Sequence, residues 1–450
     1  MDLAGRRTLV VGAARSGIAA AQFLRARGAQ VTLSDRRSLE DLDEAAALGV
    51  ELEAGGHCSE TFLKQDLIVT SPGVPWGLPV LAEARGKGIS VMGETELASR
   101  FLQGRLIGVT GSNGKTTTTA LTGKIFEAAG FHTQVGGNIG TPLISLVDSS
   151  TPETINVVEL SSFQLEGIQE LHPAVAMVLN VTPDHLDRHG DFAAYSAAKA
   201  RIFKNQTPED IAILNAEDAT CREYAHLAPS CVMMFSRLHE VAAGAFVHDG
   251  DIVYCPGEYS YTVMEVEEIL LKGAHNVENV LAAVCAALSL GADPLKVRQG
   301  VCDFKAVEHR LEFVAKLGDV EFYNDSKATN VDATIKSLEA FGDGPGKLLV
   351  IMGGLDKDSD YTPLKPLLKQ RARAVLLIGS ATEKIATHLG DVVPLVRAGT
   401  LDIAVRDAVR RCRPGDTVLL APACASFDQF KNYEHRGRVF KQIVRSLGKT

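Results

Sequence analysis

The stretch that decides the fold is LIGVTGSNGKTTTT, residues 106–119. Residues 106–110 form a short apolar run, as expected of a buried strand, and a glycine-rich turn then leads into a helix. Glycines allow successive backbone N–H groups to face an anion, and the helix N-terminus adds the positive end of its dipole. The pattern predicts a phosphate-binding loop made of Gly111, Ser112, Asn113, Gly114, Lys115, Thr116 and Thr117.

Within this loop, Lys115 is expected to contact the β- and γ-phosphates of ATP, and Thr116 to ligate magnesium. Val109 stands where the strict G-x-x-x-x-G-K-[ST] motif requires glycine, and the T-G-S-N-G-K-T form found instead points to a particular subgroup of ATP-binding proteins. The structural alternative is a glycine-rich turn with an incidental lysine. The order of strand, loop and helix favours the functional interpretation.

Strands alternating with helices on both sides of this motif predict three α/β domains in a row. A chain of 450 residues also exceeds what a single core usually serves. We expect a Rossmann-like N-terminal domain over residues 1–95, a central P-loop ATPase-like domain with a parallel sheet over residues 96–305, and a Rossmann-like C-terminal domain over residues 306–450. The strands expected to carry these domains are Thr8–Val11, Gln30–Leu33, Leu67–Val69, Ile89–Met92, Leu106–Thr110, Ile155–Leu160, Val175–Val181, Val320–Tyr323, Lys347–Met352, Ala374–Ile378 and Thr417–Leu420.

A second glycine-containing turn, Gly12–Gly17, follows the first strand and is a degenerate form of the dinucleotide-binding pattern. Asp35 ends the next strand, near the distance expected of a ribose-binding acid. The second glycine of the pattern is missing, which argues against close approach of an NAD pyrophosphate. A nucleotide site and a plain structural turn both stay open here.

Polar residues follow two strands of the central domain. Glu159 ends an apolar run, where an acid faces the phosphate loop, and it is expected to help bind magnesium. A surface carboxylate is the alternative. Beyond the next strand, His185 is the better ligand candidate, while Asp184 and Asp187 have structural roles as possible helix caps. Lys199 lies in an alanine-rich helical stretch, and its spacing alone favours a solvated side chain.

The overall composition indicates an ordinary globular protein, with 46% hydrophobic and 22% charged residues. Lysine plus arginine number 46 against 55 acidic residues, so no basic face suggests nucleic acid as a partner. The eight cysteines form no CxxC pair, which fits a reducing compartment. Without a signal peptide or an apolar run of bilayer length, we expect a cytoplasmic protein with no membrane partner.

Segments distributed over the whole chain resemble the Mur ligase family. They are GSNGKTTTT, GGNIGTP, VVELSSFQLE, NVTPDHLDRH, YSAAKARIF, GAHNVENVLAA, EHRLE, NDSKATN and ACASFDQFKNYEHRG. NDSKATN and ACASFDQF are similar in particular to the members that add D-glutamate. The resemblance implies an ATP-dependent amide-bond ligase that joins D-glutamate to UDP-N-acetylmuramoyl-L-alanine through an acyl phosphate, in peptidoglycan precursor synthesis. It also implies that small molecules are the only partners, and we expect a monomer.

The resemblance assigns roles to residues of all three domains. It implies UDP contacts in the first domain, muramoyl-alanine contacts in the central domain, and two Mg²⁺ ions near the phosphate loop. Lys199 matches a lysine that is carbamylated by CO₂, which would give a metal-binding anion beside His185 and Glu159. The substrate residues are Arg15, Arg36, Arg37, Ser71, Gly73, Asn138, Ser161, Gln164 and again His185. The nucleotide residues are Asn279, Arg310 and Asp325; those around D-glutamate are Thr329, Lys357, Ser426 and Tyr433; His309 lies near the reacting centre.

Two positions depart from the family pattern. Tyr433 stands where some relatives have phenylalanine, and Leu355 stands where some have aspartate, which leaves the partner of His309 open. Three rival hypotheses remain at this stage. A folate-type glutamate ligase normally lacks a first domain of this kind, a P-loop regulator would show no ligase activity, and an NAD oxidoreductase rests only on the Gly12–Gly17 turn.

Overall fold

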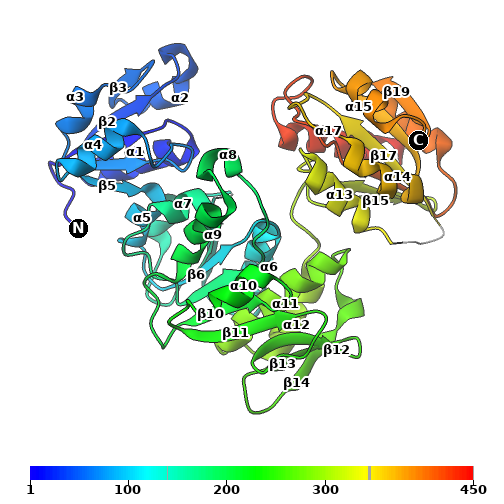
Figure 1. Cartoon of the computed structure of the whole chain (residues 1–450), viewed down its shortest axis with the longest axis horizontal. Helices are drawn as coiled ribbons and strands as arrows, with labels where there is room; N and C mark the ends of the chain where they lie inside the picture. The colour runs from blue at the N-terminus through cyan, green and yellow to red at the C-terminus, as the bar shows by residue number, and fades with distance from the viewer. Residues whose placement is uncertain (139, 343–345, 449–450) are drawn as a thin grey trace. The chain divides into compact units, whose positions relative to one another are not determined.

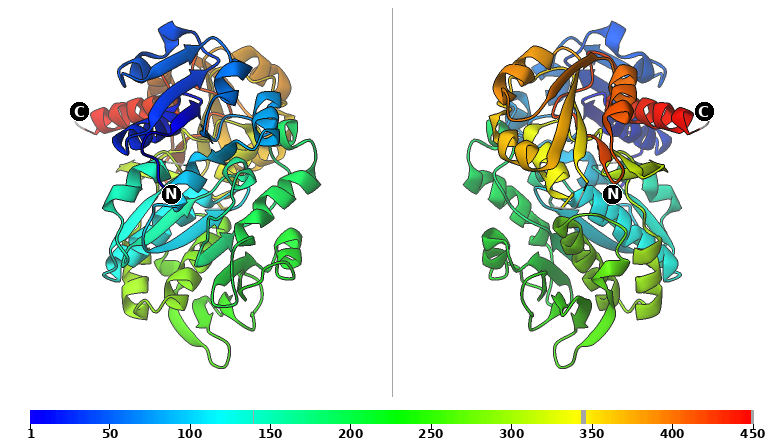
Figure 2. Two further views of the ribbon diagram at one scale, coloured as in Figure 1. Left: turned by 90° about the vertical axis from the view of Figure 1, so that its left-hand side faces the viewer. Right: turned by 90° about the vertical axis from the view of Figure 1, so that its right-hand side faces the viewer.

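The computed structural model describes residues 1–138, 140–342 and 346–448. It contains three β-sheets, each flanked by helices (Figures 1 and 2). The chain divides into two compact units. The first unit holds residues 1–268 and 277–303, and therefore the first two sheets; the second holds residues 269–276 and 304–450, and the third sheet.

The first sheet has five parallel strands in the order β3-β2-β1-β4-β5. Alternate residues of β1 pack into different cores on the two faces: Val10 lies in one cluster, and Leu9 and Val11 in the other. Burial on both faces explains why the strand is a continuous apolar run. The elements are β1 Arg7–Val11, α1 Arg15–Ala26, β2 Gln30–Asp35, α2 Asp43–Ala46, β3 Glu51–Ala54, α3 Ser59–Leu63, β4 Leu67–Thr70, α4 Pro79–Gly86, β5 Ser90–Gly93 and α5 Glu94–Ser99.

The central sheet has nine strands in the order β14-β13-β12-β11-β10-β9-β6-β8-β7. The expected parallel part is present from β7 to β12, and two antiparallel strands, β13 and β14, extend it at one edge. An alanine-rich stretch of this part of the chain lies in helix α11, which runs from Ala274 to Ser289. The elements are β6 Arg105–Thr110, α6 Lys115–Ala128, β7 Thr133–Gly137, β8 Ile155–Glu159, α7 Ser162–Glu166, β9 Val175–Val178, α8 Leu186–His189, α9 Phe192–Ala200, β10 Ile211–Asn215, α10 Ala219–Tyr224, β11 Cys231–Ser236, β12 Gly244–His248, β13 Asp251–Cys255, β14 Tyr261–Glu265, α11 Ala274–Ser289 and α12 Pro294–Asp303.

The third sheet has six strands in the order β15-β16-β20-β17-β18-β19, and only β15 is antiparallel. Strand β17 again divides its residues between two cores, with Val350 on one face and Leu349 and Ile351 on the other. The elements are β15 Glu312–Leu317, β16 Val320–Asn324, α13 Val331–Glu339, β17 Leu348–Gly353, α14 Lys365–Arg371, β18 Ala372–Ile378, α15 Thr382–Leu389, β19 Leu395–Gly399, α16 Leu401–Arg411, β20 Thr417–Leu420 and α17 Tyr433–Leu447.

Among the described residues, no helix is both long and apolar enough to cross a membrane. The three sheets share one feature that matters for function. In each, several of the polar residues singled out from the sequence follow the carboxyl ends of neighbouring parallel strands, which is where open α/β sheets bind ligands.

Candidate functional site

The phosphate loop lies between β6 and α6, as predicted. Gly114 has a left-handed backbone (φ 84°), and a Cβ at this position would lie 2.4 Å from Oδ1 of Asn279, so only glycine fits. Asn180, which follows the neighbouring strand β9, fixes the loop through two hydrogen bonds. Its carbonyl oxygen accepts from the Ser112 N–H (2.9 Å), and its Oδ1 accepts from the Asn113 N–H (2.8 Å). The turn is therefore shaped by two elements distant in sequence.

Two lysines meet at the carbonyl oxygen of Gly111. Lys115 Nζ donates to it at 2.8 Å, and Lys199 Nζ, from α9, donates at 2.7 Å. Lys199 is 1% exposed. Burial, and next the charge of Lys115, hold the pKa of Lys199 well below its ordinary value. The interpretation of Lys199 as a solvated side chain, drawn from its spacing, is wrong, because a helix face that looks alanine-rich in sequence packs against the loop.

Glu159 ends β8, next to the phosphate loop's strand, and is 1% exposed. Its Oε1 accepts from Asn138 Nδ2 at 3.1 Å, while its buried Oε2 has no hydrogen-bond partner in the described part of the chain. The alternative of a surface carboxylate is thus wrong. A buried carboxylate oxygen without a donor suits a divalent cation, since oxygen ligands are those that Mg²⁺ prefers. Together with Thr116 in the first turn of α6, this residue set fits magnesium.

His185 is half-exposed and caps α8 with a left-handed backbone (φ 52°). Its ring lies against Phe163, with centroids 4.9 Å apart, and its Nε2 is 3.6 Å from Oδ2 of Asp184. His185 is therefore accessible to a ligand, and the Asp184 carboxylate lies next to its ring. Asp187 belongs to α8, but its side chain lies outside the described residues.

Ser161 and Gln164 form a capping box at the start of α7. The Gln164 side chain is buried: its Oε1 accepts from the Ser161 N–H (2.9 Å), and its Nε2 donates to Oγ1 of Thr95 (2.9 Å). Thr95 in turn donates to the fully buried carboxyl of Glu94. This chain of bonds joins the first and central sheets within one unit. Ser71 and Gln164, from the two sheets, line the same cavity.

In the first domain, Asp35 closes the Gly12–Gly17 turn. Its Oδ2 accepts from the Ala13 N–H at 2.6 Å, and its carboxylate pairs with Arg37 at 3.0 Å. Burial alone would raise the pKa of Asp35, but these bonds hold it well below its ordinary value. The Asp35 carboxylate is thus bound to the turn and to Arg37. This agrees with the interpretation of the Gly12–Gly17 segment as a structural turn.

The remaining expected contacts of the first domain surround that turn. Ser71, after β4, donates from Oγ to the Gly12 carbonyl oxygen at 2.9 Å. Arg15 begins α1 and donates to the carbonyl oxygen of Gly140 at 3.0 Å, while Arg36 and Gly73 are exposed. Because β2, β1 and β4 are neighbours, these residues lie together at the carboxyl ends of the strands of the first sheet.

Three loops meet at the carboxyl end of the third sheet. Leu355, after β17, and Ala425, after β20, exchange backbone hydrogen bonds of 2.9 and 3.1 Å. The Ala423 N–H donates to the carbonyl oxygen of Ala328, after β16, at 2.9 Å. These bonds bring together the loops that carry the expected D-glutamate residues Thr329, Lys357, Ser426 and Tyr433. Helix α13 begins at Val331 and is capped by Asn330, so Thr329 lies just before the helix.

Arg436, which was not predicted from the sequence, holds these loops together through its guanidinium group. It is fully buried and donates to the Ser326 carbonyl oxygen (2.9 Å) and to the carbonyl oxygens of Cys424 (3.2 Å) and Ala425 (3.3 Å). Burial lowers its pKa to about 10, so it stays protonated at neutral pH. The available signal was its spacing, since Arg436 shares the i, i+4, i+8 stripe of α17 with the buried Phe440 and Val444.

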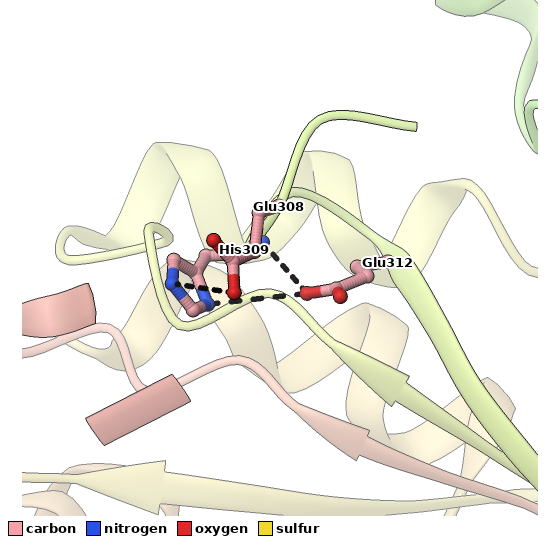
Figure 3. Close-up of side chains that lie close together, drawn as sticks. All are labelled: Glu308, His309 and Glu312. Atoms are coloured by element: carbon pink, nitrogen blue, oxygen red, sulfur yellow. Dashed lines mark hydrogen bonds and ion pairs between the residues drawn. The ribbon is translucent and has the colours of Figure 1, made fainter. Parts of the chain in front are cut away.

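His309 lies in a cluster with Glu308 and Glu312 (Figure 3). It is 2% exposed, with a left-handed backbone (φ 67°). The Asn324 amide is oriented by its other bonds: Oδ1 accepts from the Ser326 N–H, and Nδ2 donates to Glu312 at 3.0 Å. Nδ2 therefore also donates to His309 Nδ1 (2.9 Å), which places the proton of the neutral ring on Nε2. Asn324 is the partner of His309 that the sequence left open.

The same cluster has the spacing of a metal site, because its ligand atoms lie within 4.8 Å of one another. Lys441 already supplies the positive charge there. Its Nζ donates to Glu312 Oε1 at 2.8 Å and also to Glu308. Burial lowers the pKa of His309, so the ring is neutral and offers Nε2–H as a donor. The arrangement suits hydrogen bonding to an anion better than metal binding.

The expected nucleotide residues are divided between the two units. Asn279, in the first, is buried in α11 and accepts from Thr118 Oγ1 at 3.1 Å. Arg310 and Asp325 belong to the second unit. Asp325 is buried and accepts from Oγ of Ser337, and burial raises the pKa of its carboxyl.

Family models match three successive parts of the chain. Residues 6–93 match a Mur ligase MurD-like N-terminal domain, residues 109–287 a Mur ligase middle domain, and residues 309–424 a Mur ligase glutamate ligase domain. The chain belongs to the Mur ligase family. The family expected from the sequence segments is thus confirmed.

Mur ligases similar to this chain include proteins of known name and structure. UDP-N-acetylmuramoylalanine–D-glutamate ligase of Acidobacterium capsulatum is 56% identical over 99% of this chain and 97% of its own length. The protein of the same name from Koribacter versatilis is 52% identical over 99% of both chains. The crystal structure of UDP-N-acetylmuramate-alanine ligase from Thermotoga maritima has a TM-score of 0.60 at 19% identity, covering 98% of this chain and 100% of that one, which shows a shared fold.

Proposed function

We propose that this Mur ligase joins D-glutamate to UDP-N-acetylmuramoyl-L-alanine, with ATP converted to ADP and phosphate, in the synthesis of peptidoglycan precursors. The observation that carries the proposal is the 56% identity, over 99% of the chain, to a ligase named for these substrates. The match of residues 6–93 to a MurD-like N-terminal domain disfavours a folate-type glutamate ligase, which normally lacks such a domain.

The reaction has two steps. An oxygen of the alanine carboxylate attacks the γ-phosphorus of ATP, the bond from that phosphorus to the bridging oxygen breaks, and an acyl phosphate and ADP form. The amine of D-glutamate then attacks the acyl carbon, loses a proton, and expels inorganic phosphate as the amide forms. ATP is needed because a free carboxylate is a poor acylating agent. Lys115 and Arg310 offset the negative charge that develops on the transferring phosphoryl group.

The three domains divide the substrates between them. Residues 1–95 bind the UDP part through Arg15, Arg36, Arg37, Ser71 and Gly73. Residues 96–305 bind ATP and, through Asn138, Ser161, Gln164 and His185, the muramoyl-alanine end. Residues 306–450 bind D-glutamate. In support, each of these sets follows neighbouring strand ends of a single sheet or lines a shared cavity.

Ligases of this family use ATP and Mg²⁺, and two ions bound by Thr116, Glu159, His185 and the modified Lys199 would neutralise phosphate charge here. The partnerless Oε2 of Glu159 supports this assignment. Carbamylation needs the neutral amine of Lys199, which attacks CO₂ and releases a proton to give an anionic carbamate. The buried position of Lys199 and its lowered pKa favour that neutral amine. His309 donates from Nε2 near the reacting centre. We place the enzyme in the cytoplasm, as a monomer.

D-Glutamate brings two carboxylates and one nucleophilic amine, so its site needs donors or cations at two fixed points. Lys357, Thr329, Ser426 and Tyr433 surround this site, on loops tied to one another by backbone hydrogen bonds. L-Glutamate would direct its amine or its side chain away from these anchors and leave a charge unpaired, which is how such sites select.

The test is a phosphate-release assay with UDP-N-acetylmuramoyl-L-alanine and, in turn, D-glutamate, L-glutamate, L-lysine and meso-diaminopimelate. Release should require both acceptor and amino acid and should be strong only with D-glutamate. Preference for another amino acid would overturn the assignment within the family. Release that needs no amino acid would instead indicate a nucleotide-hydrolysing regulator.

A further inference from the structure

The loop after β17 carries three consecutive charged residues, Asp356, Lys357 and Asp358. Both acids turn toward Lys384 in α15, whose Nζ lies 2.7 Å from Asp356 Oδ2 and 2.9 Å from Asp358 Oδ1. Asp358 adopts a left-handed backbone (φ 60°), which lets both carboxylates reach the same ammonium group. One lysine thus binds the two acids that flank another lysine.

Asp356 is the fixed end of this arrangement. Its Oδ1 accepts from the hydroxyl of Tyr361 (2.7 Å), which is completely buried, and from the Ser359 N–H (3.2 Å). Burial favours the neutral acid, but the hydrogen bonds from Lys384 and Tyr361 lower the pKa of Asp356 to about 2. Asp356 is therefore ionised and anchored at neutral pH.

Lys357 is left as the exposed cation of the loop. Within the described part of the chain, no hydrogen bond or ion pair of its side chain is found. The backbone pairing of Leu355 with Ala425 holds this loop beside the one that carries Ser426. An ammonium group whose neighbouring acids are bound elsewhere is available to a carboxylate of a ligand.

We propose that Lys384 is a positioning residue for the D-glutamate pocket, because it withholds Asp356 and Asp358 from Lys357. The proposal rests on the proposed function, in which Lys357 contacts a carboxylate of D-glutamate. Without Lys384, an acid on either side of Lys357 becomes an intramolecular competitor of the substrate, present at high effective concentration. Lys384 is partly exposed and Asp358 fully exposed, and ion pairs of this kind contribute little to stability, so the main effect falls on substrate binding.

The experiment compares steady-state constants of Lys384→Met and the unmodified enzyme. The KM for D-glutamate should rise about three- to tenfold, the range expected for loss of a partly exposed charge contact, while kcat and the KM for ATP stay within about twofold. Lys384→Arg should remain near the unmodified value, since it keeps the cation. An unchanged KM for D-glutamate in a folded Lys384→Met enzyme overturns the proposal.

A second variant separates competition from a merely structural role. Adding Asp358→Asn to Lys384→Met removes the more exposed competitor and should recover part of the lost affinity, whereas structural damage would not be repaired. If Lys384→Met does not fold, Lys384→Gln combined with Asp358→Asn, measured against Lys384→Gln alone, provides the same comparison. The matched control is Arg397→Met, which breaks an exposed pair with Glu383 on the same helix and should change nothing.

Lys357→Ala distinguishes a failure of the proposed function from a failure of the inference about Lys384. If it leaves the KM for D-glutamate unchanged, the role of Lys357 in the proposed function fails, and this inference fails with it. If Lys357→Ala raises that KM strongly while Lys384→Met does not, only the inference about Lys384 is overturned.

Discussion

The buried lysines of the two units occupy opposite electrostatic environments. In the first unit, Lys199 lies beside the phosphate loop with its ammonium on a carbonyl oxygen, and no ion pair of it is found among the described residues. In the second, Lys441 binds two carboxylates at once, which raises its pKa despite the opposing effect of burial. Lys384 is paired in the same way.

The difference separates two uses of one residue type. A lysine that is buried without an ion pair is driven toward its neutral form, which is the form that can act as a nucleophile, whereas a lysine between two acids stays charged and fixes geometry. Glu94 in the first unit extends the comparison, because it too is fully buried, and burial raises its pKa to about 7. Within the described part of the chain, Lys199 and Glu94 of the first unit are thus buried without a counter-charge bound to them, whereas Lys441 of the second unit is balanced by two carboxylates.

The largest effect is expected at Lys115. Lys115→Ala should lower kcat by on the order of a thousandfold or more, because it removes a cation that stabilises charge in the transition state. The fold should survive, which circular dichroism and thermal unfolding would check. Lys124→Ala is the control, since Lys124 makes an exposed pair in the same helix. Near-normal turnover in folded Lys115→Ala would remove the assignment of the ATP site.

Lys199→Ala should come next, with a loss of about a hundredfold or more. Small carboxylates such as acetate or formate should restore part of the activity by occupying the space of the missing carbamate. Phosphate release measured with and without added carboxylate would show this. The control is Lys204→Ala, an exposed lysine after the same helix. Full activity in Lys199→Ala would mean that the buried amine has no chemical role.

Glu94 should make the stability of the first unit depend on pH. Its folded pKa of about 7 lies above the unfolded value, so the native state binds the proton more tightly, and stability falls as pH rises from about 4.5 to about 7. Glu94→Gln should remove this slope and add up to about 3 kcal/mol at pH 8. Urea unfolding at pH 5 and pH 8 measures the change in the free energy of unfolding. The control is Glu83→Gln, at an exposed glutamate. An equal slope in both proteins would contradict the burial argument.

The smallest effect is expected at Lys441. Lys441→Met should destabilise the second unit by about 1–2 kcal/mol, because Glu308 and Glu312 lose their shared counter-charge. Adding Glu308→Gln should recover part of the loss. The urea midpoints of the single and double variants give the coupling directly. A stable Lys441→Met would show that the two acids do not need this cation.

The sequence by itself determined the fold class and most strand positions, because strands buried on both faces are continuous apolar runs that stand out locally. Strand Thr417–Leu420 has the predicted bounds, and most of the other predicted strands differ by one to three residues at an end. The unpredicted strands are β3, β7, β10, β11, β12, β13, β14, β15 and β19. Of these, β3, β7, β14, β15 and β19 are edge strands, where burial and alternation give a weaker signal. The phosphate loop was also predicted, because its glycines, lysine and threonine are consecutive in the sequence.

Only the tertiary structure decided the environments of the charged groups. The burial of Lys199, the carbonyl oxygens held by Arg436 and the amide orientation of Asn324 beside His309 all depend on contacts between residues far apart in the chain. Spacing along one helix cannot report what packs against it. The cost of burying a charge, and hence its chemistry, is set by those distant neighbours and not by the local sequence.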